Sequence, residues 1–257
     1  FILYPQSFNI SAALDAGAQR IGGCILADGS IGSETAAVSE PYLNSTSRGV
    51  LYQSDEFWQQ FISEASKHNL QVAVHCIGDR AIRQINNVYK AIPATEELRH
   101  ELIHCELTDD ALIQEIAISK AVPVMQPNFD LLWGGENGFY AKKLGIKRSR
   151  IMNRFANLLK AGITITGGSD WYVTPLNAAQ SIKAAINHHN PQEGLTIAQA
   201  IDIYTKNAAW LNFEEHCAGQ IKPSYVADLS IYSQPVEKET SQLCYVVRKG
   251  EIKYAAQ

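Results

Sequence analysis

The sequence predicts an α/β fold built on a parallel sheet, and two features of its 257 residues support this class. Short apolar runs rich in valine and isoleucine alternate with segments whose apolar residues recur at helical spacing. Polar residues such as histidine and aspartate stand where several of these runs end. Alternating strands and helices indicate a parallel sheet, either closed into a barrel or open with helices on both faces. We count five strand–helix units between residues 20 and 211, whereas a closed (β/α)₈ barrel has eight.

The expected elements follow one another in a regular order. Strands are expected at residues 20–27, 70–74, 101–106, 121–127 and 162–170. Helices are expected at residues 10–16, 54–65, 81–91, 109–120, 149–159, 175–187 and 196–211. Ser54, Asp79 and Thr108 are expected N-caps, because their side-chain oxygens can accept hydrogen bonds from the first helical amides. Gly17 is an expected C-cap, and the segment with Asn128, Asp130 and Trp133 is expected to be a loop.

From residue 219 the pattern changes to alternating strands. Residues 226–232 form one expected strand, and residues 243–254 form a hairpin that turns at Lys249 and Gly250. We therefore predict two parts. Residues 1–215 form the last five units of a partial (β/α)₈ TIM barrel, the fourth to the eighth, and residues 216–257 form a small β-sandwich appendage.

The composition indicates a folded protein and bears on its partners and its cellular compartment. With 46% apolar and 19% charged residues, the chain is expected to fold around a full core. A net charge of −4 without charge runs indicates a small-molecule substrate and disfavours nucleic acid or a membrane as partner. Five cysteines without a CxxC pair indicate a reducing compartment, so we expect the cytoplasm. Because the first residue is Phe1, we expect the true amino terminus, with any targeting signal, to lie upstream.

Polar residues at the ends of the expected strands form a candidate site. They are the Asp28 loop, His75, His104, Gln126 or Asn128, and Asp170. Two neutral imidazoles and a carboxylate suit zinc or a similar divalent ion. A metal lowers the pKa of its bound water, and Asp170 can take the water proton and pass it to a leaving nitrogen. The sequence has no GxSxG elbow and no GxGxxG or GxxxxGK[ST] motif, so serine-nucleophile chemistry and nucleotide sites are not indicated.

Several blocks of the sequence resemble the amidohydrolase superfamily. Two of them are Val74-His-Cys-Ile-Gly-Asp-Arg-Ala81 and Arg99-His-Glu-Leu-Ile-His104, and the others occupy residues 21–36, 125–127, 168–176 and 219–229. The blocks occur in the family's order over nearly the whole chain. The nearest branch is the amidohydrolase-3 group, which includes N-substituted formamide deformylases.

The resemblance implies a metal-dependent hydrolase with a (β/α)₈ barrel. His75 corresponds to the family's fifth-strand metal ligand and His104 to its sixth-strand ligand. Asp170 corresponds to the eighth-strand aspartate that binds metal and acts as the base. The family's first-strand His-x-His pair has no counterpart here, which suggests the carboxyl-terminal half of a longer protein. Cys24-Ile-Leu-Ala stands where many relatives have a bridging lysine, so one metal is expected rather than two.

Alternative interpretations stay open at several positions. Cys24 is either a ligand or a buried inert thiol, and the second is favoured. Asp79 either pairs with Arg80 to support His75 or contacts substrate, and Asp28 either lines the pocket or serves the turn. We predict substrate contacts from Asp28, Asp79, Gln126 and Trp171. His188 and His189 are interpreted as a solvated helix end, and His100 as a hydrogen-bonded core residue.

Two functional hypotheses follow. The first is an enzyme in which His75, His104 and Asp170 bind one metal and hydrolyse an amide or other C–N bond, with Asp170 and His104 as catalytic residues. The second is an incomplete and inactive barrel that needs the missing amino-terminal half. Soluble proteins avoid unpaired strand edges, so we expect that half as a partner. A homodimer is also allowed.

Overall fold

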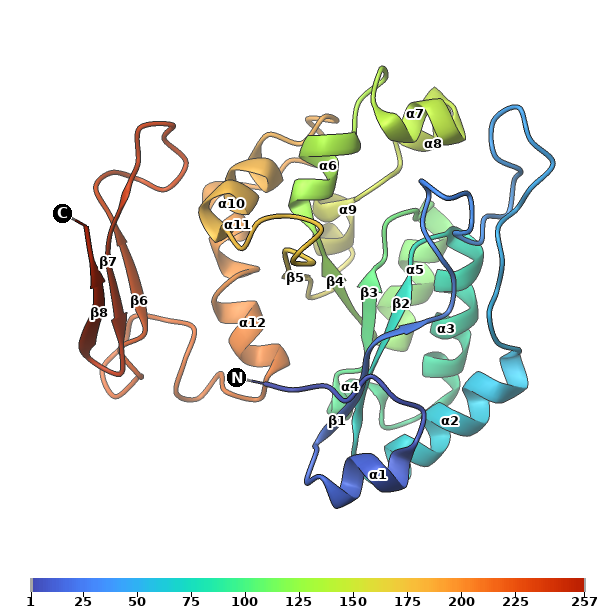
Figure 1. The fold of residues 1–257 in the computed structure, drawn as a ribbon, viewed down its shortest axis with the longest axis horizontal. Helices are drawn as coiled ribbons and strands as arrows, with labels where there is room; N and C mark the ends of the chain where they lie inside the picture. The colour runs from blue at the N-terminus through green and yellow to red at the C-terminus, as the bar shows by residue number, and fades with distance from the viewer. Residues whose placement is uncertain (1, 257) are drawn as a thin grey trace.

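A five-stranded parallel sheet is the centre of the fold in the computed structural model, which describes residues 2–256 (Figure 1). Its strands follow chain order and are β1 (Arg20–Leu26), β2 (Gln71–Cys76), β3 (Glu101–His104), β4 (Val122–Met125) and β5 (Thr166–Gly167). Each strand pairs in parallel with the next. The predicted α/β class with a parallel sheet is therefore confirmed.

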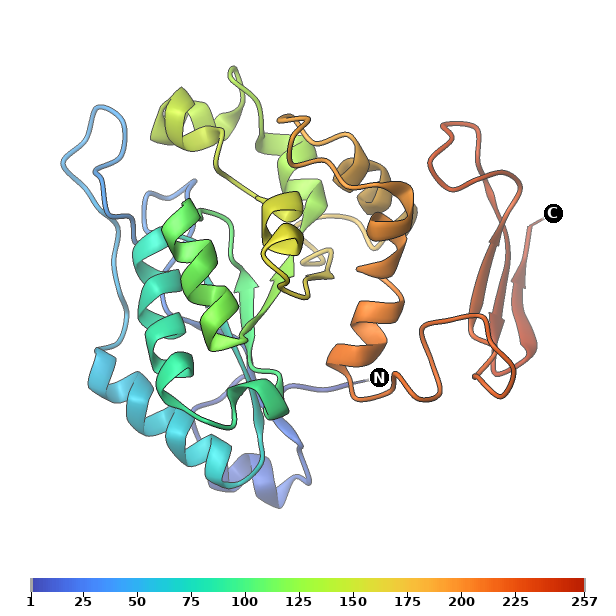
Figure 2. The same cartoon turned by 180° about the vertical axis from the view of Figure 1, so that it is seen from behind.

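Helices fill the connections between the strands. They are α1 (Ile10–Asp15), α2 (Asp55–Lys67), α3 (Asp79–Ala91), α4 (Thr95–Leu98), α5 (Asp110–Ser119), α6 (Pro127–Trp133), α7 (Phe139–Leu144), α8 (Ile146–Ser149), α9 (Phe155–Lys160), α10 (Ala178–Ile186), α11 (Ile197–Asp202) and α12 (Lys206–Leu211). Figure 2 shows α2, α3 and α5 in front of the sheet. No helix of residues 2–256 is long and apolar enough to cross a membrane.

The main hydrophobic core lies between the sheet and these helices. Trp58 of α2, Ile82 of α3 and Leu112 of α5 are fully buried in it. Val72 and Leu102 of the neighbouring strands are also fully buried. Each buried side chain of this size contributes roughly 1.5–3 kcal/mol relative to exposure. This packing holds β2 and β3, and with them the two histidines at their ends, in a rigid frame.

The caps of two helices differ from the predictions. Helix α2 begins after Ser54 as expected, but Gly78 rather than Asp79 caps α3. Asp79 lies in the first turn of α3, and its carboxylate accepts a hydrogen bond from the Ser39 backbone N–H at 2.9 Å. Asp109, not Thr108, caps α5. In both cases the cap is a residue next to the predicted one, and its backbone has the extended conformation of an N-cap; only Asp109 also accepts a hydrogen bond with its side chain.

Three longer segments also differ from the predictions. Residues 127–133, predicted as a loop, form α6. Pro127 is in its first turn, where the backbone N–H that proline lacks has no partner within the helix. The predicted helix at 149–159 is interrupted because Met152 pairs with Leu107 and Asn153 adopts a positive φ of 54°. The predicted helix at 196–211 is likewise two helices, α11 and α12. In residues 149–159, the contact between Met152 and Leu107 overrides helical periodicity.

A separate three-stranded antiparallel sheet follows α12. It consists of β6 (Leu229–Tyr232), β7 (Leu243–Arg248) and β8 (Glu251–Ala255), in the order β6-β7-β8. The predicted hairpin turn is confirmed, and Lys249 and Gly250 both have positive φ, at 52° and 79°. In Figure 1 this sheet lies beyond α10 and α12, away from the parallel sheet.

Candidate active site

Two histidines meet at the carboxyl edge of the parallel sheet. His75 is the penultimate residue of β2, and His104 ends β3. The register pairs His75 with Ile103 and Cys76 with His104, so the histidines lie on adjacent strands and are offset by one residue. Their ring centroids are 4.6 Å apart, and both side chains are buried. Parallel strands place their carboxyl ends on one edge, which is why residues 29 apart in sequence converge here.

A neighbouring glutamine orients the ring of His104. The Nδ1 of His104 lies 2.8 Å from Oε1 of Gln126, the residue that caps α6. An amide oxygen only accepts hydrogen bonds, so Nδ1 carries the proton and Nε2 keeps its lone pair. Burial lowers the pKa of His104 to about 3, and His75 adds to the effect. His104 is therefore neutral, which is the form that binds metals.

The carboxylate of Asp28 faces the Nδ1 side of the His75 ring. The His75 Nδ1 lies 3.5 Å from the Asp28 Oδ1 and has no hydrogen-bond partner among the described residues. The Asp28 carboxylate is fully buried and accepts backbone N–H groups of Ala37, Ile77 and Gly78 at 2.8–3.0 Å. Asp28 is thus held in place and does not line the cavity described below. A carboxylate facing Nδ1 directs Nε2 outward, as in many metal-binding histidines.

Asp170 follows β5, the edge strand at the opposite end of the sheet from β1. It lines a cavity of about 480 Å³ together with His75 and His104. Burial raises the pKa of the Asp170 carboxyl, while His75 opposes this. Trp171 comes next, but it is 67% exposed and is not part of the cavity wall.

The rest of the cavity wall is mainly aromatic and apolar. It includes Phe129 and Trp133 of α6, Phe139 and Tyr140 of α7, and Glu106. None of the described residues that line it is lysine or arginine.

Sequence reasoning missed Glu106. This residue is 2% exposed, and its Oε2 accepts a hydrogen bond from the Tyr140 hydroxyl at 2.6 Å. Burial raises the pKa of Glu106 to about 8, and the charges of Asp28 and Asp170 add to the effect. The available signal was its place two residues after His104, at the same edge of the sheet.

The side chains at the floor of the cavity suit a divalent ion. His75 and His104 each have Nδ1 turned to an oxygen, which leaves Nε2 available, and Asp170 lines the same cavity. The ligand atoms of these three residues do not all lie within 4.8 Å of one another, a distance that Asp130, His188 and His189 do meet among residues 2–256. Cys24 also lines the cavity. Burial raises the pKa of its thiol, with Asp170 contributing, so the inert-thiol interpretation is favoured over a thiolate ligand.

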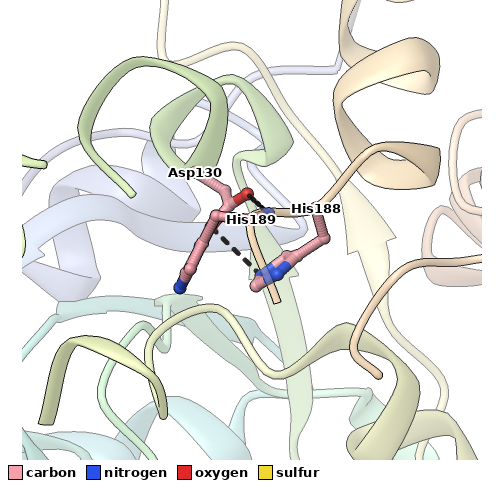
Figure 3. A group of neighbouring side chains, drawn as sticks. All are labelled: Asp130, His188 and His189. Carbon is pink, nitrogen blue, oxygen red and sulfur yellow. Dashed lines mark hydrogen bonds and ion pairs between the residues drawn. The ribbon is translucent and has the colours of Figure 1, made fainter. Parts of the chain in front are cut away.

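A second group of metal-type donors lies elsewhere, between α6 and the segment after α10 (Figure 3). Asp130 Oδ2 accepts the backbone N–H of His189 at 2.9 Å, and Oδ1 contacts His189 Nδ1. His188 Nε2 lies 3.1 Å from Asp130 Oδ1 and 3.0 Å from the Asn153 carbonyl oxygen. His188 Nδ1 accepts the Asn190 N–H at 3.0 Å. Both nitrogens of His188 are therefore used in hydrogen bonds.

The burial of this second group corrects one prediction, and its hydrogen bonds explain how α6 contacts the segment after α10. His188 is only 4% exposed, so the interpretation of the pair as a solvated helix end is wrong. The reason is Asp130, a buried carboxylate that attracts the donors of both histidines. The group acts as a polar clamp that joins α6 to the segment after α10, and we call it the Asp130 clamp.

Two other predictions concern supporting residues. Asp79 bonds to Ser39, and no ion pair between Asp79 and Arg80 is found within residues 2–256. Asp79 does not line the cavity. His100 is fully buried, accepts the Val72 N–H at Nδ1 and contacts Ser66 Oγ at 2.9 Å. The interpretation of His100 as a hydrogen-bonded core residue is confirmed.

Comparison with known proteins places this arrangement in context. Residues 14–254 match the model of the amidohydrolase family. The chain is 29% identical over 250 residues to YtcJ of Bacillus subtilis, covering 90% of this chain and 46% of YtcJ. It thus spans less than half the length of the curated relatives that it matches.

Solved structures share the fold. An uncharacterized metal-dependent hydrolase from Pyrococcus furiosus superposes with a TM-score of 0.71 and 24% identity, over 84% of this chain and 46% of that one. Another from Pyrococcus horikoshii OT3 superposes with a TM-score of 0.73 and 21% identity, over 95% of this chain and 51% of that one.

Proposed function

The chain belongs to the amidohydrolase family, and on that premise we propose that it is the metal-binding half of a hydrolase that cleaves amide or other C–N bonds in a small molecule. The observation that carries the proposal is the pair of buried histidines, 4.6 Å apart, which share one cavity with Asp170. The names of the two Pyrococcus structures, both metal-dependent hydrolases, agree with it.

One divalent ion, zinc by the type of ligand, would be held by His75, His104 and Asp170. Such an ion supplies Lewis acidity and a water of lowered pKa when bound. Neutral His104, with its pKa near 3, stays available as a ligand at any ordinary pH. Cys24 replaces the bridging lysine of many relatives, which supports one ion rather than two.

The protein's own residues transfer the water proton and orient the two histidine rings. Asp170 takes the proton of the attacking water and delivers it to the leaving nitrogen. Gln126 positions His104 and Asp28 positions His75, so both act through the histidines. Direct substrate contact by Asp28, Asp79, Gln126 or Trp171 stays a prediction.

We propose that the remaining barrel strands come from another part of the parent protein. The parallel sheet has two open edges, β1 and β5, whereas a closed barrel of this type has eight strands. The missing part would include the His-x-His pair and would cover these edges. Residues 1–215 would then complete the barrel and residues 216–257 the sandwich. A second copy of the chain is the alternative cover, and the five free cysteines support a cytoplasmic setting.

Elemental analysis of metal content tests the proposal. It compares this chain, the full-length protein and the His75→Ala variant of each. About one equivalent in the full-length protein and none in the chain alone would show that the missing half completes the site. Stoichiometric metal in the chain, lost in His75→Ala, would show that His75, His104 and Asp170 suffice. Absence of metal from both forms would contradict the metallohydrolase proposal.

A further inference from the structure

We propose that Phe139, which faces Gly32 at the rim of the cavity, is a specificity-determining residue and limits the length of an uncharged apolar substituent on the substrate. The inference rests on the proposed function, because it names the class of substrate for the same cavity. Its basis is the composition of the cavity wall and the spacing between Phe139 and Gly32.

Above the proposed metal ligands, the cavity wall is largely apolar. It includes Ile31, Ile77, Phe129, Trp133, Tyr140 and Val173. Because no lysine or arginine of residues 2–256 lines the cavity, a substrate carboxylate there would have no counter-charge from this chain. Burying an unpaired charge is unfavourable, whereas each methylene group that leaves water for an apolar wall is stabilising. The wall therefore favours an uncharged apolar substituent.

Phe139 and Gly32 stand where this wall meets solvent. Both line the cavity, and both are exposed, Phe139 to 38%. A Cβ atom on Gly32 would lie 3.4 Å from Cε1 and 3.6 Å from Cζ of the Phe139 ring. These are contact distances between carbon atoms, so the gap admits a methyl group bonded to Gly32 but no free alkyl chain. The two residues therefore close this side of the cavity, and a long substituent meets the Phe139 ring.

The segments that carry Phe139 and Gly32 are joined to each other. In Figure 1, α7 and α8 lie beside the loop that connects β1 to α2. Lys143 of α7 forms a 2.7 Å ion pair with Glu34, two residues after Gly32. A small hydrophobic core also spans the two segments. It includes Ile31, Tyr42, Tyr140 and Leu144. The spacing between Phe139 and Gly32 is therefore fixed by packing on both sides.

A series of N-alkylacetamides, from ethyl to decyl, measures the length limit. With the full-length, metal-loaded protein, we expect kcat/KM to rise by roughly threefold per methylene until the chain reaches Phe139, and then to fall. Phe139→Ala should move the optimum to chains longer by about two methylenes or more, because it opens the rim. Gly32→Val should move the optimum to shorter chains, and its backbone tolerates valine because Gly32 has no positive φ.

Phe8→Ala is the matched control. Phe8 is similarly exposed, at 41%, but packs on Phe57 and Phe61 and does not line the cavity. This variant should keep the wild-type optimum. The apolar requirement has its own test, since 6-acetamidohexanoate has about the length of N-hexylacetamide but ends in a carboxylate. We expect its kcat/KM to be lower by about tenfold or more.

Binding without turnover separates this inference from the proposed function. If no amide is hydrolysed, the proposed function fails, and isothermal titration of the same amides then gives the length dependence of Kd. Opposite shifts of the optimum in Phe139→Ala and Gly32→Val support the inference in either measurement, and one variant decides if the other does not fold. An optimum that stays unchanged, equal values for N-hexylacetamide and 6-acetamidohexanoate, or no binding of any amide would overturn it.

Discussion

The molecule contains two groups of two histidines and one aspartate, and they differ in where the ring nitrogens point. In the cavity group, His75 and His104 direct Nδ1 toward Asp28 and Gln126, which leaves Nε2 free. In the Asp130 clamp, the ring nitrogens of His188 are occupied by backbone groups and by Asp130 itself. The same residue types thus serve two different purposes.

For His188, hydrogen-bond saturation rather than residue type marks a structural role, whereas Nε2 of His189 is buried without a partner among the described residues. A nitrogen that already has its partners must lose them before it can bind an ion. The clamp still serves the cavity, because α6 carries Asp130 between Phe129 and Trp133, which line the cavity. One group is suited to chemistry, and the other holds part of the wall in place.

The largest expected effect comes from the cavity group. His104→Ala removes one of two imidazole ligands, so metal-dependent turnover should fall by at least about a thousandfold. Steady-state kinetics and metal content of the full-length protein measure the effect. His68→Ala, at the exposed end of α2, should leave both unchanged. Normal metal content and turnover in His104→Ala would remove the distinction between the two groups.

The clamp should respond in stability and not in metal content. Asp130→Ala leaves the largely buried backbone N–H and Nδ1 of His189 without their acceptor, while His188 keeps the Asn153 carbonyl oxygen, so the free energy of unfolding should fall by about 3 kcal/mol. Chemical denaturation measures this value, with the exposed Asp110 changed to Ala as control. If Asp130→Ala instead lost metal and kept its stability, the clamp would be the metal site.

A smaller effect is expected from the residue that orients His104. Gln126→Ala removes the acceptor for Nδ1, so metal affinity should fall by about 10- to 100-fold. Competition with a chelator gives the affinity. The matched change is Gln84→Ala, since Gln84 is also buried but bonds to Asp55 far from the cavity. An equal loss of affinity in both variants would mean that the effect is not specific to His104.

The smallest effect concerns a third kind of histidine, His100, which bonds only within the core. Burial lowers its pKa to about 3, below the unfolded value of 6.5, so the unfolded chain binds more protons below pH 6.5. Its contribution to stability is therefore complete above pH 6.5 and is lost as the pH falls toward 3. Between pH 6.5 and 5.5, the wild type should lose about 1 kcal/mol more than His100→Asn, which keeps an acceptor for Val72. Denaturation at both pH values tests this, and equal losses would show that His100 titrates normally.

The strands that carry the histidines were predicted more completely than the helices, whereas the strand expected at 162–170 is reduced to β5 (Thr166–Gly167). The β-branched runs before His75 and His104 form strands as expected, because each is buried on both faces. The helix predicted across Met152 and Asn153 failed because Met152 bonds across to Leu107. The local periodicity of the sequence cannot predict a pairing between residues as distant as Leu107 and Met152.

The sequence by itself determined the α/β class, the five parallel strands, the family, and the histidines and aspartate at the strand ends. These features follow from local runs and motifs, since a β-branched segment that ends in a polar residue predicts both the strand and the place where it ends. Only the tertiary structure decided which nitrogens are free, that Glu106 lies buried among aromatic rings, and that His188 bonds inside the protein rather than to water. The physical reason is that hydrogen-bond partners and burial depend on residues distant in the chain, which fold together only when the sheet and helices pack.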